Sequence, residues 1–137
     1  MLPEAITAVI TSGDKVLFIC RGPSVPGAGY WAPPSGKIEP GESQEAAVVR
    51  ESREEVGLTV QPLRKVWENL SAGGSHRLYW WLAEYVSGEL SLDPREVSEA
   101  RWLTMEEVWS LEPIFEGDRE FFQKVFPHLC LAQAITT

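Results

Sequence analysis

The 137-residue sequence has few cysteines and no long hydrophobic run. Its two cysteines, Cys20 and Cys130, lack the spacing of a metal or redox site, so both are predicted to be reduced thiols. No apolar run approaches the ~20 residues that a membrane span requires, and the N-terminus lacks a signal-peptide pattern. These absences predict a cytoplasmic protein that does not interact with a membrane.

Basic residues are also scarce. Twelve Lys and Arg against twenty Asp and Glu give a formal net charge of −8 at pH 7. An anionic protein has no general attraction for a phosphate backbone, so polymeric nucleic acid is not an expected partner. Small phosphorylated substrates are compatible with this charge, because a bound cation reverses the local charge.

The length and composition are typical of one globular domain. At 137 residues the chain can bury roughly two-thirds of its unfolded surface. Its 44% hydrophobic and 23% charged residues are typical of an ordinary soluble protein. Its patterns predict strands and helices at separate places, which favours a mixed sheet between helices. The expected strands span 5–11, 16–20, 76–86 and 100–103, with one or two more, broken near Pro62, in 58–69. The expected helices span 44–56, 104–111 and 118–126.

Three glutamates between residues 46 and 58 are the most informative feature of the sequence. If this segment is helical, Glu51, Glu54 and Glu55 lie at positions i, i+3 and i+4 and share one face. Like charges at this spacing destabilise a helix, whereas a cluster of hard oxygen ligands suits a divalent cation such as Mg²⁺ or Mn²⁺. The cluster therefore predicts a metal site, with a solvated acidic helix face as the alternative.

Start and stop signals define this helix. Ser43 is a preferred N-cap, and Gly57 can take the positive φ of the residue that follows a helix. Segment 31–37 contains paired prolines, so it is predicted to be a rigid loop that leads into the helix. The expected apolar stripe consists of Ala46, Val49 and Val56.

The spacing of glycines and charged residues around this helix resembles the Nudix box, which would span residues 36–58. The flanks are similar to the family too, with an N-terminal hairpin, a tryptophan before the loop and a late strand at Ala100–Leu103. The resemblance implies a single Nudix domain over residues 1–137, with an α/β/α sandwich in which a mixed β-sheet lies between α-helices. The matching positions are Gly36, Glu42, Arg50-Glu51, Glu54-Glu55 and Gly57-Leu58.

Two positions depart from the family's pattern. The family usually has an aliphatic residue where this chain has Ser52, whose buried hydroxyl would need a partner such as a backbone carbonyl one turn back. It also usually has Gly-Gly where this chain has Ser35 and Gly36. In relatives the carbonyl of the first glycine often ligates the metal, and Ser35 can offer its carbonyl instead if its φ is negative.

The resemblance implies that the acidic helix binds Mg²⁺, for which Mn²⁺ can substitute. Relatives often recruit one more acid from a late loop, where Glu96 fits best by its spacing to the following strand and Glu99 is second. The metal ligands assigned on the helix and the preceding loop are the carbonyl of Ser35 and the carboxylates of Glu51, Glu54 and Glu55.

The catalytic base is expected to be one of these carboxylates. Glu51 and Glu54 are both candidates to accept the proton of the attacking water, because coupled carboxylates share their titration. Arg50 is expected to orient a neighbouring carboxylate or to neutralise the cluster, and Glu42 to support the loop. The supporting positions are Gly36, Glu42, Arg50 and Gly57.

Candidate substrate contacts lie on both sides of this segment. Arg21 and Lys37 are candidate phosphate contacts, with ordinary surface positions as the alternative. Trp80 and Trp81 are adjacent in an expected strand and must face opposite sides, so one of them could face the site. No role is predicted for the two histidines. The aromatic residues that could stack on a base are Tyr30, Trp80, Trp81 and Phe115.

The function predicted from the resemblance is Mg²⁺-dependent hydrolysis of a phosphoanhydride bond in a nucleoside diphosphate linked to another group. By size the chain resembles MutT-type nucleoside triphosphate pyrophosphohydrolases, with nucleotide-sugar or dinucleotide-polyphosphate hydrolysis as alternatives. A non-catalytic Nudix module that binds nucleotides or proteins is the alternative from another class. The oligomeric state is left open, and a homodimer is possible.

Overall fold

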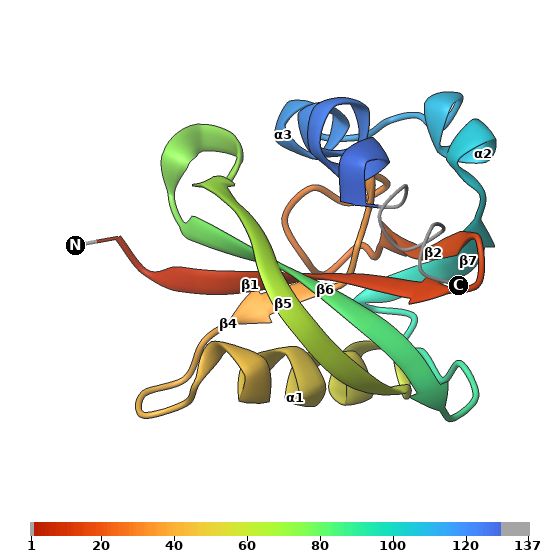
Figure 1. Ribbon diagram of the computed structural model, residues 1–137. Coiled ribbons are helices and arrows are strands. Elements are labelled where there is room, and N and C mark those ends of the chain that lie inside the picture. Colours follow the sequence, from red (N-terminus) through yellow and green to blue (C-terminus); the bar gives the residue numbers. More distant parts are fainter. Residues whose placement is uncertain (1, 130–137) are drawn as a thin grey trace.

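The computed structural model describes residues 2–129 and places a mixed β-sheet at the centre of the molecule (Figure 1). Its seven described strands are β1 (Glu4–Ser12), β2 (Lys15–Arg21), β3 (Trp31–Ala32), β4 (Ser35–Lys37), β5 (Thr59–Leu70), β6 (Arg77–Ser87) and β7 (Val97–Leu103). The main path runs β3-β2-β1-β6-β5, while β4 pairs with β1 and β7 pairs with β2. β1 runs parallel to β6 on one edge and antiparallel to β2 and β4 on the other, so it lies in the middle of the sheet.

Helices cover both faces of the sheet (Figure 1). One face carries α1 (Gln44–Val56). The other carries α2 (Met105–Trp109) and α3 (Glu116–Glu120), which continues into the π-helical turn η2 (Phe121–Val125). The predicted sandwich of a mixed sheet between helices is therefore confirmed. Within residues 2–129, no helix is both long and apolar enough to cross a membrane.

Each face of the sheet has its own hydrophobic core. The core under α2 and α3 includes Val9, Phe18, Trp80, Leu82, Phe121, Phe122 and Phe126. The core under α1 includes Ile6, Ile10, Leu17, Ala47, Val48 and Val56. Successive residues of β1 and β2 alternate between the two cores. This double burial explains the continuous apolar run at 16–20.

The boundaries of α1 are those that the sequence predicts, but its buried face is not. The Ser43 hydroxyl accepts a hydrogen bond from the Ala46 N–H at 3.1 Å, and Gly57 ends the helix with a φ of 77°. The buried residues of α1 are Ala47, Val48, Ser52 and Val56, so the predicted stripe was wrong at Ala46 and Val49. The stripe is centred near Ser52, which turns Glu51 and Glu55 toward β4.

Ser52 is fully buried, and its hydroxyl has no hydrogen-bond partner among the described residues. The predicted bond to a backbone carbonyl is therefore not formed. An unpaired buried hydroxyl costs free energy of folding, because it loses its bonds to water without replacing them.

Other segments also differ from the sequence predictions. Segment 31–37 forms the short strands β3 and β4 on either side of its prolines rather than a loop throughout. β7 begins at Val97, because this residue pairs with Arg21 across a register shift. Residues 126–129 are still helical past Pro127, where the predicted helix ends. In η2 the Phe126 N–H donates to a carbonyl five residues back, and this wider turn precedes the proline.

The cysteine prediction is covered only in part by the structure. Cys20 is partly buried at the end of β2 and forms no disulfide with another residue in the range 2–129. Cys130 lies outside the described residues.

Candidate functional site

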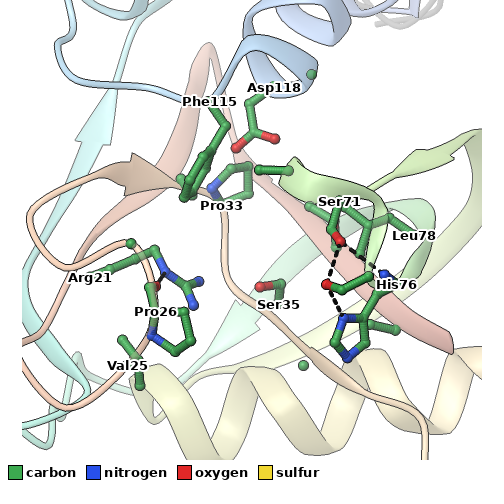
Figure 2. A pocket seen from close by; sticks show the side chains of 18 of the residues that line it. Arg21, Val25, Pro26, Pro33, Ser35, Ser71, His76, Leu78, Phe115 and Asp118 are labelled. Atoms are coloured by element: carbon green, nitrogen blue, oxygen red, sulfur yellow. Dashed lines mark hydrogen bonds between the residues drawn. The ribbon is translucent and has the colours of Figure 1, made fainter. Parts of the chain in front are cut away.

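A cleft of about 870 Å³ opens between α1, the β5–β6 turn around η1 (Ala72–Gly74) and the start of α3 (Figure 2). β4, the loop after β2 and individual residues of β1, β2 and β6 also line it. Among its lining residues are these predicted site residues: Arg21, Ser35, Gly36, Lys37, Glu51, Glu55 and Glu96. The cleft thus gathers acidic and basic candidates from segments that are far apart in the sequence.

The floor of the cleft depends on the absence of a side chain at Gly36. A Cβ at this position would lie 2.1 Å from Cδ of Glu51, well inside the van der Waals contact distance. The glycine backbone of β4 can therefore approach the Glu51 carboxylate closely. Only glycine permits this approach without displacing Glu51.

Arg50 connects the acids of α1 with the loop before it. Its Nε donates to Glu42 at 2.7 Å, and its Nη1 donates to Glu51 at 2.7 Å and to Glu54 at 3.1 Å. Its Nη2 also donates to the Lys37 carbonyl at 2.9 Å. The hydrogen bond from Arg50 lowers the pKa of Glu42 to about 2. Arg50 thus holds the loop against the helix and balances part of the negative charge.

Burial raises the pKa values of the two α1 carboxyls that face the cleft. Desolvation raises the pKa of Glu51, and the bond from Arg50 opposes that shift. Desolvation raises the pKa of Glu55 to about 7, opposed mainly by the Ser35 N–H, which donates to Glu55 at 3.2 Å. The charges of Glu51 and Glu96 raise this pKa further. Glu51 and Glu96 therefore each repel the charged form of Glu55, which a cation would relieve.

As they stand, no three acidic, histidine or cysteine side chains of residues 2–129 converge closely enough to hold a metal ion. Arg50 forms ion pairs with Glu51 and Glu54. The Glu54 side chain is 61% exposed, and it is not among the described residues that line the cleft. The donor set nevertheless fits a hard divalent cation, because Glu51, Glu55 and Glu96 line one cleft beside the close backbone approach at Gly36.

Of the two late acids, Glu96 lies at the cleft. Its carbonyl accepts from the Gly22 N–H at 2.8 Å, which fixes the end of the loop next to β2. The side chain of Glu99 instead pairs with Arg101. The geometry therefore favours Glu96 over Glu99 as a member of the site.

Arg21 and Lys37 both line the cleft. The Arg21 side chain extends into it, and its Nε donates to the Pro26 carbonyl at 2.6 Å (Figure 2). Lys37 is the last residue of β4, the strand that carries Gly36 at the floor of the cleft. Both cations are therefore placed where a phosphate group on the floor could meet them.

Neither predicted tryptophan lines the cleft. Trp80 is fully buried, stacks on Phe121 and donates its Nε1–H to Asn69 at 2.8 Å. Trp81 lies on the opposite side of β6 and donates to Gln44 at 2.8 Å. The proposed contacts of Trp80 and Trp81 with substrate are thus not supported, because both indoles pack against the helices that cover the sheet.

The aromatic residues that do reach this region come from two loops. Phe115 lines the cleft just before α3. Its ring stacks on Tyr30 with centroids 4.6 Å apart and an angle of 19° between the ring planes. This pair leaves an apolar surface beside Arg21, of the kind that contacts a planar group.

Asp118 is a cleft residue that the sequence reasoning missed. It lies in the first turn of α3, is 8% exposed, and points toward Pro33 (Figure 2). Desolvation raises its pKa to about 7, and the charge of Arg21 opposes the shift. An acid in the first turn of a helix is usually exposed, so nothing local in the sequence indicated its burial.

A polar turn between β5 and β6 forms another wall that the sequence reasoning missed. Ser71, Ser75 and His76 are joined by hydrogen bonds and line the cleft (Figure 2). The sequence assigns His76 no role because its partners are serines of the same turn rather than a spaced motif.

Comparisons with known proteins agree on one family. The family model described as the NUDIX domain matches residues 1–125. A relative from Stutzerimonas stutzeri, named NAD-capped RNA hydrolase NudC, is 32% identical over 110 residues, which are 80% of this chain and 39% of the relative. The chain therefore spans about two-fifths of the length of this relative.

Solved structures are similar over nearly the whole chain. A MutT NUDIX hydrolase from Burkholderia pseudomallei has a TM-score of 0.75 and 26% identity, covering 91% of this chain and 98% of that one. A NUDIX-family hydrolase from Clostridium perfringens has a TM-score of 0.76 and 22% identity, covering 94% and 99% respectively. The second likeness is one of fold.

Proposed function

This chain belongs to the Nudix hydrolase family, and from that premise we propose that it cleaves a phosphoanhydride bond in a nucleoside diphosphate linked to another group. The observation that carries the proposal is the placement of Glu51 and Glu55 on the floor of a cleft beside Gly36, with Glu54 on the same helix. Hydrolysis of such a bond depends on charge neutralisation and a positioned water more than on covalent chemistry.

The residues that would hold a divalent cation are Glu51, Glu54, Glu55 and Glu96, with the carbonyl of Ser35. Bound Mg²⁺ or Mn²⁺ supplies polarisation of a phosphoryl oxygen and a more acidic bound water. Glu54 is largely exposed and can swing away from Arg50, whereas Glu51 is held by Arg50 and by its contact with β4. Either Glu51 or Glu54 would accept the proton of the attacking water.

The cations around the cleft give the phosphates their orientation. Arg21 and Lys37 would each contact phosphate oxygens, because they line the same cleft as the acidic floor. Arg50 would keep the loop and the helix in register while its charge balances Glu42. These roles need no movement of the sheet.

Two candidates remain for the group that is linked to the nucleoside diphosphate. A nucleoside triphosphate is one candidate, because a protein named as a MutT NUDIX hydrolase is 26% identical to this chain. A nucleotide-sugar or dinucleotide is the second candidate, because the cleft has a second polar wall at the β5–β6 turn. Polymeric nucleic acid is not an expected substrate. Because one relative is named for NAD-capped RNA, a capped oligonucleotide tests this expectation.

A non-catalytic module is the alternative from another class. Such modules typically lose acids of the box, and this chain keeps Glu51, Glu54 and Glu55. Their retention favours the hydrolase.

The test is a phosphate-release screen with Mg²⁺ and with Mn²⁺ across nucleoside triphosphates, nucleotide-sugars, dinucleotides and NAD-capped RNA. On any substrate that responds, Glu54→Gln should lower kcat by about 10²- to 10⁴-fold, since it removes a ligand or the base. Its melting temperature should stay close to that of the wild type, because the side chain is exposed.

The matched control is Glu45→Gln, an exposed acid in the first turn of the same helix, which should keep full activity. Binding of nucleotides without turnover across the screen would favour the non-catalytic module. Unchanged kcat in Glu54→Gln would remove this residue from the mechanism.

A further inference from the structure

The β5–β6 turn holds three polar side chains in one connected cluster. The Ser71 and Ser75 hydroxyls lie 3.1 Å apart, and the Ser75 hydroxyl lies 2.9 Å from Nδ1 of His76. The His76 N–H donates to the Ser71 hydroxyl at 3.0 Å. The Ser75 hydroxyl therefore links the Ser71 hydroxyl to the His76 ring, the His76 backbone holds Ser71, and the cluster lines the cleft (Figure 2).

Two glycines shape the turn that carries this cluster. Gly73 and Gly74 have φ values of 80° and 75°, which other residues rarely adopt. A Cβ on either would have no atom within 4 Å, so the glycines serve the backbone path rather than close packing. The Ser71 N–H donates to the His76 carbonyl at 2.9 Å and closes the turn. The cluster is thus preorganised before any ligand arrives.

The cluster and Arg21 lie on opposite sides of the cleft, with Ser35 between them (Figure 2). A substrate whose pyrophosphate lies over the acidic floor would therefore extend toward both sides. A nucleoside triphosphate has only one organic end, so its other end would bring phosphate charge to the cluster. Among the described residues of the β5–β6 wall that line the cleft, none is Lys or Arg. This wall therefore brings no positive charge of its own to a terminal phosphate.

The chemistry of the wall suits an uncharged polyhydroxylated group instead. Serine hydroxyls both donate and accept hydrogen bonds, as sugar hydroxyls do. Ser75 engages Nδ1 of His76, so Nε2 is the ring nitrogen that can meet a ligand. Leu70 and Leu78 line the cleft beside the cluster and offer apolar contact to the C–H groups of a ring.

We propose that Ser71, Ser75 and His76 form the subsite for a sugar joined to the distal phosphate, so that the substrate class is a nucleoside diphosphate linked to a sugar or to a second nucleoside. The inference rests on the proposed function, because it takes the acidic floor as the site of the pyrophosphate. It selects between the two substrate candidates given above.

The experiment compares two substrates that share a base, ADP-ribose with ATP or UDP-glucose with UTP, as the screen selects. Ser75→Ala and His76→Ala should each raise KM for the sugar-linked substrate about tenfold, the effect of one lost hydrogen bond, and leave KM for the triphosphate unchanged. Ser75→Thr retains the hydroxyl and should restore the wild-type KM. His128→Ala is the histidine control, because this residue does not line the described cleft.

Three kinetic outcomes would overturn the subsite: a wild type that hydrolyses only triphosphates, equal losses on both substrates, or no change in KM in either variant. Calorimetric titration of ADP-ribose and UDP-glucose, with Mg²⁺ present, separates the subsite from the proposed activity. Binding that weakens about tenfold in Ser75→Ala supports the subsite even if nothing is hydrolysed, in which case the hydrolase proposal fails. Absence of binding in the folded wild type overturns the subsite.

Discussion

The α1 wall and the α3 wall of the cleft each contain a carboxyl with a raised pKa, half-buried on α1 and buried on α3, but the two carboxyls have different surroundings. Desolvation raises the pKa of Glu55 on α1 and of Asp118 on α3 to about 7. Glu55 accepts a backbone hydrogen bond and lies near two further acids. The Asp118 carboxyl makes no hydrogen bond to another described residue, points toward Pro33, and feels the charge of Arg21 (Figure 2). The same pKa thus arises in a charge cluster and in an isolated acid.

This comparison separates two kinds of destabilised polar group. On the α1 wall the repulsion among acids can be relieved by a cation. On the α3 wall the cost is desolvation of a single carboxylate, and it disappears when that carboxylate binds a proton. Near neutral pH, Asp118 therefore alternates between a form that only accepts and a form that also donates a hydrogen bond.

Replacement of Asp118 by Asn should have the largest effect, a change in how the free energy of unfolding depends on pH. A folded-state pKa raised from 3.8 to about 7 means that the wild type loses stability as pH rises through this interval. Asn does not titrate, so the free energy of unfolding of Asp118→Asn minus that of the wild type should grow by up to about 3 kcal/mol between pH 5 and pH 8. Urea unfolding at the two pH values measures this difference.

The control for that experiment is the exposed acid Glu116 in the same turn, whose replacement by Gln should give a difference independent of pH. A constant difference between Asp118→Asn and the wild type would mean that the Asp118 carboxyl is hydrated and has an ordinary pKa in the folded protein.

Replacement of Gly36 by Ala tests whether the α1 wall depends on close packing. The new Cβ would overlap Glu51, so the carboxylate must move and kcat/KM should fall by roughly 10-fold or more, alongside a loss of about 1–3 kcal/mol in stability. Steady-state kinetics and urea unfolding measure the two effects. The α3 wall has no comparable contact with Glu51, so Asp118→Asn should leave this floor intact.

A double-mutant cycle sharpens the test. In a Glu51→Ala background the overlapping side chain is gone, and Gly36→Ala should then have little effect on stability. The same loss in both backgrounds would show that the glycine is required by its backbone rather than by its contact with Glu51.

Replacement of Ser52 by Ala should have the smallest effect. Ser52 is a third kind of buried polar group. Its hydroxyl faces only the core under α1 and lacks a partner among the described residues. Ser52→Ala should raise the free energy of unfolding by about 1 kcal/mol and leave kcat/KM unchanged. Ser43→Ala, the same change at the N-cap of this helix, should lower it by about 1 kcal/mol. Two losses of equal size would mean that Ser52 has an unseen partner.

The sequence predicted what depends on local geometry. The ends of α1 follow from Ser43 and Gly57, whose capping roles are set by neighbouring backbone groups. Thr104 and Glu107 likewise form a capping box, which begins α2 at the start of the predicted helix at 104–111. Glu51 and Glu55 lie in the cleft because the helical spacing that relates them also fixes their common side.

What the sequence did not predict depends on contacts between distant segments. Trp80 appeared suitable for stacking, but Phe121 and Phe122 arrive from the last helix and bury it. Asp118 became a cleft residue because α3 places its first turn over Pro33, far away in the chain. The buried face of α1 is centred near Ser52, which likewise depends on how the helix packs against the sheet. The periodicity of the helix sequence alone does not reveal this orientation.

The parallel pairing of β1 with β6 has a consequence for how the chain is made. Ala5 pairs with Leu78 and Thr11 with Glu84, so one edge of the first strand has no neighbour until about seventy more residues have left the ribosome. Loop closure over that distance is entropically costly, and the sheet can close only late in synthesis. A nascent chain halted before β6 would therefore expose an apolar strand edge, which can pair with another chain and favour aggregation.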